Sequence, residues 1–307
     1  MSSYFPDGIW PTMVTPFDDS GEIDYPALDS MVDWYIENGS NGLFATCQSS
    51  ESFFLSLKER AEVTAYIKKS AGSRIPVIAS GHVSYGLEDQ VKELNVIAEA
   101  GADAVILISN RLARANESDD VMLDRLDRLV ARLPKEIPLG FYECPYPYKR
   151  ILTQKVIRYC VESGRFYFLK DTSCDIENIR EKIGILQGSR MKLYNANTAT
   201  LLESLRAGAA GYSGVMGNYH PWLYRWLFDH RNTEPEKAEL LQSILTMCSF
   251  IELKNYPSSA KECLHLYGVP ITCQTRKNPA PSLSQTERLE VCQLKLISDY
   301  MRRVLEG

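Results

Sequence analysis

Short apolar runs alternate with longer amphipathic stretches over most of the chain. Most of the runs are continuously apolar instead of alternating with polar residues, which is typical of strands that are covered on both faces of a parallel sheet. The predicted strands are Ile9–Thr15, Gly42–Cys47, Pro76–Ser80, Ala104–Ser109, Ile137–Tyr142, Phe166–Lys170, Lys192–Asn195 and Gly211–Val215.

The stretches between these runs have the spacing of amphipathic helices, and several are followed by glycine, as helix ends commonly are. The clearest are Asp24–Asn38, Leu57–Ser70, Leu87–Ala100 and Thr198–Ala207. A strand followed by a helix, repeated eight times, predicts a (β/α)₈ TIM barrel. A doubly wound sheet is the main alternative, but no Gly-x-Gly-x-x-Gly segment follows an early strand.

The pattern changes after residue 220. The rest of the chain predicts helices such as Lys237–Leu253 and Gln285–Leu305, and no flexible linker precedes them. Prolines interrupt this part at Pro257, Pro270, Pro279 and Pro281. We therefore expect a barrel over residues 1–220 and a C-terminal helical region over residues 221–307 that packs on it.

Composition and charge exclude several classes of function. The net charge is -5 and the basic residues do not cluster, which argues against nucleic acid or an anionic membrane as the main partner. No apolar run approaches the ~20 residues that span a bilayer, and no signal peptide is expected. The eight cysteines are scattered, without metal-ligand spacing. We predict a soluble cytoplasmic protein with reduced thiols and no metal site.

Candidate catalytic residues lie where the predicted strands end, because active sites of α/β barrels form at that face. Lys170 ends the apolar run that begins at Phe166. Burial disfavours an ammonium ion and lowers the pKa of the amine, which makes it a nucleophile towards a carbonyl group. The alternative is a lysine paired with a carboxylate at the barrel rim.

Two neighbouring segments add polar groups. Tyr142 ends the fifth predicted strand, and its phenol can relay a proton to an imine, although a core tyrosine bonded to backbone is the alternative. The loop Gln48–Glu51 offers hydroxyl and backbone N–H groups that can hold a carboxylate. For Ser50 and Glu51, ordinary helix capping explains the same residues.

These segments together resemble the dihydrodipicolinate synthase / N-acetylneuraminate lyase superfamily of pyruvate-dependent class I aldolases, over nearly the full chain. The resemblance is carried by Gly8–Phe17, Tyr142-x-x-Pro145, Leu169–Thr172 and Gly208–Gly211. It implies that Lys170 forms a Schiff base and that Tyr142 relays protons. It also implies that Ser49 binds the pyruvate carboxylate and that Ser213 presents its backbone carbonyl to the substrate. No cofactor is implied, because the imine supplies the electrophile. A homo-oligomer, commonly a tetramer, is expected.

The chain also departs from the family pattern. Gln48 stands where relatives carry a hydroxyl residue of the proton relay, and an amide does not readily shuttle a proton. Ser109–Arg111 lacks the tyrosine by which dihydrodipicolinate synthases reach a neighbouring subunit. Thr198 and Ala199 replace the acidic pair with which sialic-acid lyases hold sugar hydroxyls. Neither namesake activity is therefore well supported.

Three hypotheses follow. The leading one is a lyase that makes or breaks a C–C bond next to pyruvate or a related 2-oxo acid, with an aldehyde or sugar acid as second substrate. The second is a dehydratase of a 2-keto-3-deoxy sugar acid that uses the same imine. The third is a non-catalytic barrel that binds a 2-oxo acid. The segment Tyr142–Arg150, with Arg111 and Arg114, fits an anionic or ring-bearing substrate, or else a solvated surface.

Overall fold

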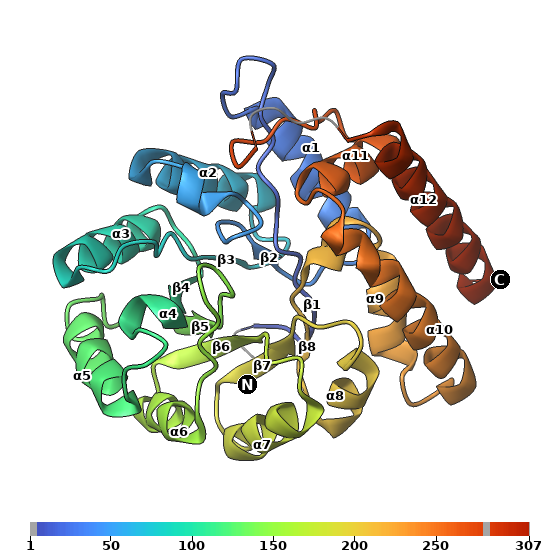
Figure 1. Ribbon diagram of the computed structural model, residues 1–307. Helices are drawn as coiled ribbons and strands as arrows, with labels where there is room; N and C mark the ends of the chain where they lie inside the picture. The colour runs from blue at the N-terminus through green and yellow to red at the C-terminus, as the bar shows by residue number, and fades with distance from the viewer. Residues whose placement is uncertain (1–4, 279–282, 307) are drawn as a thin grey trace.

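Eight parallel strands form a ring at the centre of the computed structural model, which describes residues 5–278 and 283–306 (Figure 1). The strands are β1 (Gly8–Ile9), β2 (Leu43–Phe44), β3 (Val77–Ala79), β4 (Ala104–Ile108), β5 (Leu139–Tyr142), β6 (Phe166–Asp171), β7 (Lys192–Asn195) and β8 (Gly211–Tyr212). Their order is β1-β8-β7-β6-β5-β4-β3-β2, and a parallel bridge between Thr12 and Phe44 joins the two ends. The predicted (β/α)₈ barrel is confirmed.

Several strands are shorter than the apolar runs that predicted them. Beyond β1 the chain reaches Pro11, which has no amide hydrogen to donate to a strand ladder, so pairing continues only as an isolated bridge. Beyond β8 the chain turns into the 3₁₀ helix η2 (Val215–Asn218). Both departures leave irregular backbone at the end of the barrel where the strands finish.

Helices surround the ring. They are α1 (Tyr25–Glu37), η1 (Ser52–Phe54), α2 (Leu57–Ala71), α3 (Leu87–Glu99), α4 (Ser109–Leu112), α5 (Asp119–Val130), α6 (Gln154–Ser163), α7 (Ile176–Leu186) and α8 (Leu201–Ala207). Local chemistry sets their ends: Ser56 and Glu59 form a reciprocal capping box at the start of α2. Gly208 follows α8 with a φ of 111°, which only glycine adopts without strain.

The C-terminal part consists of α9 (Pro221–His230), α10 (Pro235–Cys248), η3 (Ser249–Leu253), α11 (Ser258–Leu266) and α12 (Gln285–Glu306). These helices gather along one side of the barrel (Figure 1), where α9 contacts β1 and η3 contacts η2. The predicted helix Lys237–Leu253 is wrong in its last turn, which tightens to 3₁₀ geometry. Pro279 and Pro281 lie outside the described residues.

Alternation along the strands divides the core into two clusters. Phe168 packs inside the barrel with Trp10, Phe44 and Tyr194, whereas Leu169 belongs to the larger cluster between strands and helices. The ring centroids of Phe168 and Tyr194 lie 4.2 Å apart. Because successive strand residues point to opposite faces, Lys170 must point inwards, above this aromatic floor. Among the described helices, none is long and apolar enough to cross a membrane.

Candidate active site

Lys170 and Tyr142 lie side by side at the ends of adjacent strands. β5 and β6 pair with Tyr142 opposite Lys170. The Lys170 Nζ lies 4.3 Å from the centroid of the Tyr142 ring and 5.8 Å from that of Phe44. Only 3% of Lys170 is exposed. The amine is therefore held over aromatic rings in a sheltered position.

The surroundings of Lys170 favour the neutral amine. Burial lowers its pKa, while Cys47, Cys144 and Glu252 oppose the shift. Within the described residues its amine forms no ion pair with a carboxylate, so the rim-lysine alternative is not what the structure contains. A buried amine without a counter-ion is available for addition to a carbonyl group.

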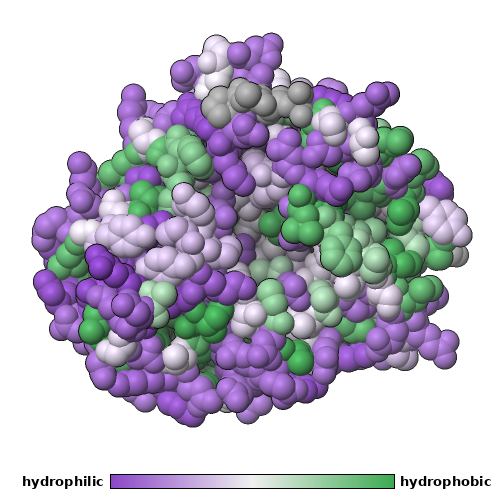
Figure 2. All heavy atoms as spheres, viewed as in Figure 1, coloured by the Kyte–Doolittle hydropathy of each residue, from purple (hydrophilic) through white to green (hydrophobic). Residues whose placement is uncertain are grey.

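A cavity of about 190 Å³ opens beside the amine. Its lining residues are Gln48, Ser49, Glu51, Phe53, Phe54, Tyr142, Pro145, Tyr146, Lys170, Val215, Tyr256, Pro257 and Lys277. Figure 2 shows a hollow near the centre of this face, between the barrel loops and the C-terminal helices. Residues from both parts of the chain thus form one pocket, as concave substrate sites commonly do.

Gln48 and Ser49 contribute polar groups to the cavity lining. The Gln48 Oε1 accepts from the Tyr142 hydroxyl at 3.3 Å and from the Cys144 thiol at 3.4 Å. The Ser49 hydroxyl donates to Thr12 Oγ1 at 3.1 Å. Burial raises the pKa of Tyr142 well above its ordinary value, so the phenol stays protonated. Tyr142 therefore holds a proton close to the Lys170 amine.

Ser50 and Glu51 have structural partners. The Ser50 hydroxyl bonds to the backbone of Cys47. Glu51 has a φ of 59°, and its carboxylate contacts the Lys261 ammonium at 2.9 Å. The same carboxylate accepts from the backbone N–H groups of Arg276 and Lys277 at 2.7 and 2.9 Å. Glu51 thus fastens the loop after β2 to the C-terminal region.

The other predicted binding residues lie outside the cavity lining. Ser213 is buried after β8, and its amide donates to the Asn195 carbonyl at 2.9 Å. The Arg111 guanidinium lies between two rings, 4.5 Å from the centroid of Tyr85 and 5.0 Å from that of Phe53. Arg111 therefore contacts the cavity lining through the ring of Phe53. Arg114 is exposed.

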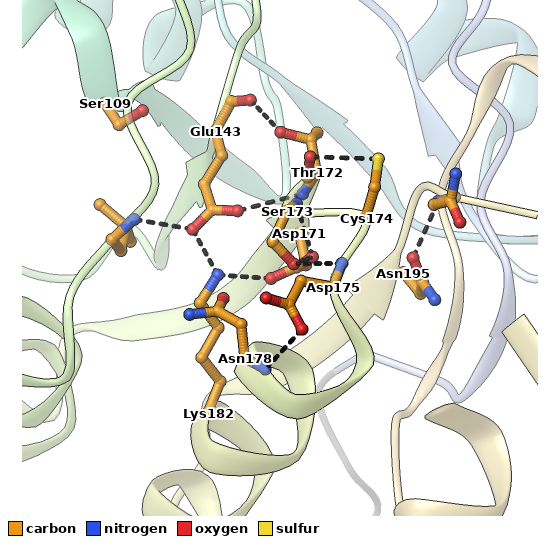
Figure 3. Close-up of polar contacts among 12 residues, drawn as sticks. Ser109, Glu143, Asp171, Thr172, Ser173, Cys174, Asp175, Asn178, Lys182 and Asn195 are labelled. Atoms are coloured by element: carbon orange, nitrogen blue, oxygen red, sulfur yellow. Dashed lines mark hydrogen bonds and ion pairs between the residues drawn. The ribbon is translucent and has the colours of Figure 1, made fainter. Parts of the chain in front are cut away.

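A buried ion cluster behind the strands was missed by the sequence prediction. The Lys182 ammonium on α7 lies 2.7 Å from Glu143 Oε1 and 2.5 Å from Asp171 Oδ2 (Figure 3). The Glu143 carboxylate also accepts from the backbone N–H groups of Leu152 and Thr172. Glu143 and Asp171 directly follow Tyr142 and Lys170, so strand alternation points them away from the cavity. An acidic residue directly after each of the two candidate catalytic residues was therefore the sequence signal from which the cluster could have been predicted.

Glu252 was also missed. It lies on η3, and burial raises its pKa to about 7 while the charge of Lys170 opposes that shift. The charge of its carboxylate raises the pKa of Lys170 and that of Tyr212. Lys170 is on β6 and Tyr212 is on β8, the two strands that flank β7. The local sequence carries no signal for this position, because only the packing of η3 on the barrel brings the carboxyl near the amine.

Solved structures share this fold. A dihydrodipicolinate synthase of Bacillus anthracis has a TM-score of 0.82 at 22% identity and covers 94% of this chain and 97% of its own. A Clostridium difficile protein in complex with mannosamine has a TM-score of 0.84 at 17% identity, covering 95% and 99%. An Escherichia coli K12 prophage protein of the dihydrodipicolinic acid synthase family, in complex with pyruvate, has a TM-score of 0.83 at 21% identity, covering 96% and 98%.

Sequence comparison gives the family. The 4-hydroxy-tetrahydrodipicolinate synthase of Bacillus subtilis is 26% identical over 282 residues, which is 91% of this chain and 94% of that protein. The model of the dihydrodipicolinate synthetase family matches residues 6–296. Together with the barrel and the sheltered lysine at the end of β6, these matches identify the chain: it belongs to the dihydrodipicolinate synthetase family of pyruvate-dependent Schiff-base aldolases.

Proposed function

We propose that this protein makes or breaks a C–C bond at C3 of pyruvate or a related 2-oxo acid through a Schiff base on Lys170. One observation carries the assignment of the site. The Lys170 amine is buried, has no carboxylate counter-ion within the described residues, and lines a cavity beside the Tyr142 phenol. The pyruvate complex of the Escherichia coli relative supports the choice of substrate.

The chemistry follows from these groups. Lys170 attacks the ketone, water leaves, and the protonated imine withdraws electrons from C3 so that a proton is lost there. Tyr142 carries protons to and from the reacting oxygen. Ser49, the amide of Gln48 and the backbone N–H groups of their loop hold the carboxylate. We propose that the backbone carbonyl of Ser213 contributes from the β8 side.

Reductive trapping tests this proposal. Incubation with pyruvate and borohydride should add one reduced pyruvyl group, found by mass spectrometry on the peptide that contains Lys170. A protein that stays unmodified while a known class I aldolase is trapped in parallel would rule the proposal out. Pyruvate release on turnover separates the aldolase from the dehydratase, which produces none. Trapping without turnover across a broad aldehyde panel would favour the non-catalytic barrel.

Tyr142→Phe should lower kcat by about 10²-fold and leave KM nearly unchanged, because it removes a proton carrier but keeps the ring beside the amine. Steady-state kinetics give both constants. Tyr194→Phe is the matched control: this barrel-interior tyrosine donates to the Pro6 carbonyl and is absent from the cavity lining. Equal losses in the two variants would show that Tyr142 has no special part in proton transfer.

Glu252→Gln should shift the pH profile of imine formation to lower pH. The Glu252 carboxylate stabilises the Lys170 ammonium, so its removal lowers the pKa of Lys170 further and raises the neutral fraction at a given pH. Because the pKa of Glu252 is about 7, the two proteins should differ above that pH and converge below it. Initial trapping rates on both sides of pH 7 measure the effect.

The control for this variant is Glu236→Gln, which removes an exposed carboxylate from α10. Its profile should match that of the unmodified protein. A Glu252→Gln profile that shifts to higher pH, or does not move, would contradict the electrostatic role of this carboxylate.

We also propose that the protein is a cytoplasmic homotetramer. Its eight cysteines are free, as expected in a reducing compartment. Apolar side chains on α10, η3 and α12 are exposed, including Met247 at 66%, Leu253 at 80% and Leu296 at 68%. An apolar surface of this kind is typical of subunit contacts. Sedimentation analysis would give the subunit number, and a monomer at all concentrations would disprove the assembly.

A further inference from the structure

The cavity beside Lys170 is lined by a few polar groups and by many apolar and aromatic residues. Tyr142 lies beside the amine, and its hydroxyl donates to Gln48. Apart from Glu51 and Lys277, the other lining residues are apolar or aromatic: Phe53, Phe54, Pro145, Tyr146, Val215, Tyr256 and Pro257. A small 2-oxo acid needs the polar groups for its carboxylate, which leaves a mainly apolar and aromatic surface for the molecule that reacts with it.

Gln48 and Ser49 are assigned to the carboxylate of the oxo acid, and the other charged side chains of the lining besides Lys170 already have protein partners. The Lys277 ammonium donates to the Tyr256 backbone carbonyl at 3.3 Å. The Glu51 carboxylate is shared among the Lys261 ammonium and two backbone N–H groups. A polyhydroxylated chain would lose hydrogen bonds to water here and regain few, which is unfavourable for binding.

The aromatic wall is held in place. The Phe53 and Tyr146 ring centroids lie 5.1 Å apart at an interplanar angle of 59°. The Arg111 guanidinium lies over the ring of Phe53 and also over that of Tyr85. Arg111 is 6% exposed, so this cation–π contact is largely desolvated and therefore strong. The ring of Phe53 is thus held in place by Tyr146 and Arg111, at a position where it lines the cavity and can pack against a planar ligand.

We infer that the second substrate is an aldehyde bearing an aromatic ring, which packs against Phe53 and Tyr146 while its carbonyl carbon faces the imine on Lys170. This inference rests on the proposed function. In the addition direction, C3 of the enamine bonds to the aldehyde carbon, and the aldehyde oxygen takes a proton relayed by Tyr142. Water then hydrolyses the imine and releases a 4-hydroxy-2-oxo acid together with the free Lys170 amine.

The test compares benzaldehyde with glyceraldehyde as acceptors for pyruvate. The expected kcat/KM is at least about tenfold higher for benzaldehyde, since a ring that stacks on an aromatic wall gains binding that a polyol does not. Phe53→Ala should reduce this preference by about tenfold, and Phe53→Leu, which keeps an apolar side chain, should reduce it less. Tyr300→Ala, an exposed aromatic on α12, is the control and should keep the full preference.

The outcomes separate the two proposals. Pyruvate trapped on Lys170 together with faster reaction of glyceraldehyde would overturn the inference and leave the proposed function standing. An equal loss with both aldehydes in Phe53→Ala, with pyruvate trapping intact, would also overturn it, since the ring would then not discriminate between acceptors. Failure to trap pyruvate at all would overturn the proposed function and the inference with it.

Discussion

Lys170→Met is expected to abolish borohydride trapping with pyruvate and to lower kcat/KM by at least about 10⁴-fold, because the variant lacks the amine that we propose forms the imine. The fold should survive. Lys170 is 3% exposed and burial disfavours its charge, so an apolar side chain of similar length fits the same space without a desolvation cost. Thermal unfolding should therefore occur at the same or a higher temperature.

Lys277→Met is the matched control, because Lys277 also lines the cavity. Its ammonium is exposed, and we expect full trapping with pyruvate in this variant. If trapping were lost in Lys277→Met but kept in Lys170→Met, Lys277 would be the lysine that forms the Schiff base, and the assignment of Lys170 would be wrong.

Lys182→Met is expected to destabilise the protein by about 3–5 kcal/mol, because it leaves two buried carboxylates without their cation. Glu143 and Asp171 have fully buried side chains, and Lys182 contacts both. Burial opposes the charge of Lys182, but the two carboxylates together raise its pKa, so the ammonium is the charge that holds the cluster. Urea unfolding at neutral pH measures the loss.

The control is Lys237→Met, which removes an exposed lysine from its pair with Glu234 and should change stability by less than about 1 kcal/mol. Combining Lys182→Met with Glu143→Gln and Asp171→Asn should recover part of the stability, because the uncompensated charges are removed. A loss below about 1 kcal/mol in Lys182→Met alone would show that the cluster does not support the strand ends.

The sequence was most informative where a local pattern coincides with a rule of the fold. Continuous apolar runs mark strands covered on both faces, and the residues that end two such runs, Tyr142 and Lys170, meet because β5 and β6 pair in parallel register. The same rule brings the loop that contains Gln48 to the same mouth. Strand ends were less predictable, because Pro11 and the turn into η2 interrupt pairing inside apolar segments.

The far side of the cavity lies beyond such rules. Its lining there includes Tyr256, Pro257 and Lys277 of the C-terminal region. The (β/α)₈ fold does not prescribe where helices that follow the barrel pack against it. Glu252 is near Lys170 only through the packing of η3 on η2. Arg111 was interpreted as a possible anion site, yet its guanidinium lies between two rings, and no spacing along the chain distinguishes these uses.

The Glu51 carboxylate binds the backbone N–H groups of Arg276 and Lys277 and so connects the barrel to the C-terminal region. The barrel therefore cannot be exchanged or shortened as an independent module. Removing the last quarter of the chain would free the loop that we propose holds the oxo acid and would also remove Tyr256, Pro257 and Lys277 from the cavity lining. Conversely, transplanting that quarter from a relative would bring a new set of acceptor contacts to an unchanged imine chemistry. The two parts of the chain therefore share the wall that faces the acceptor, Phe53 and Tyr146 from the barrel loops and Tyr256 from the C-terminal region, whereas the imine chemistry belongs to the strands alone.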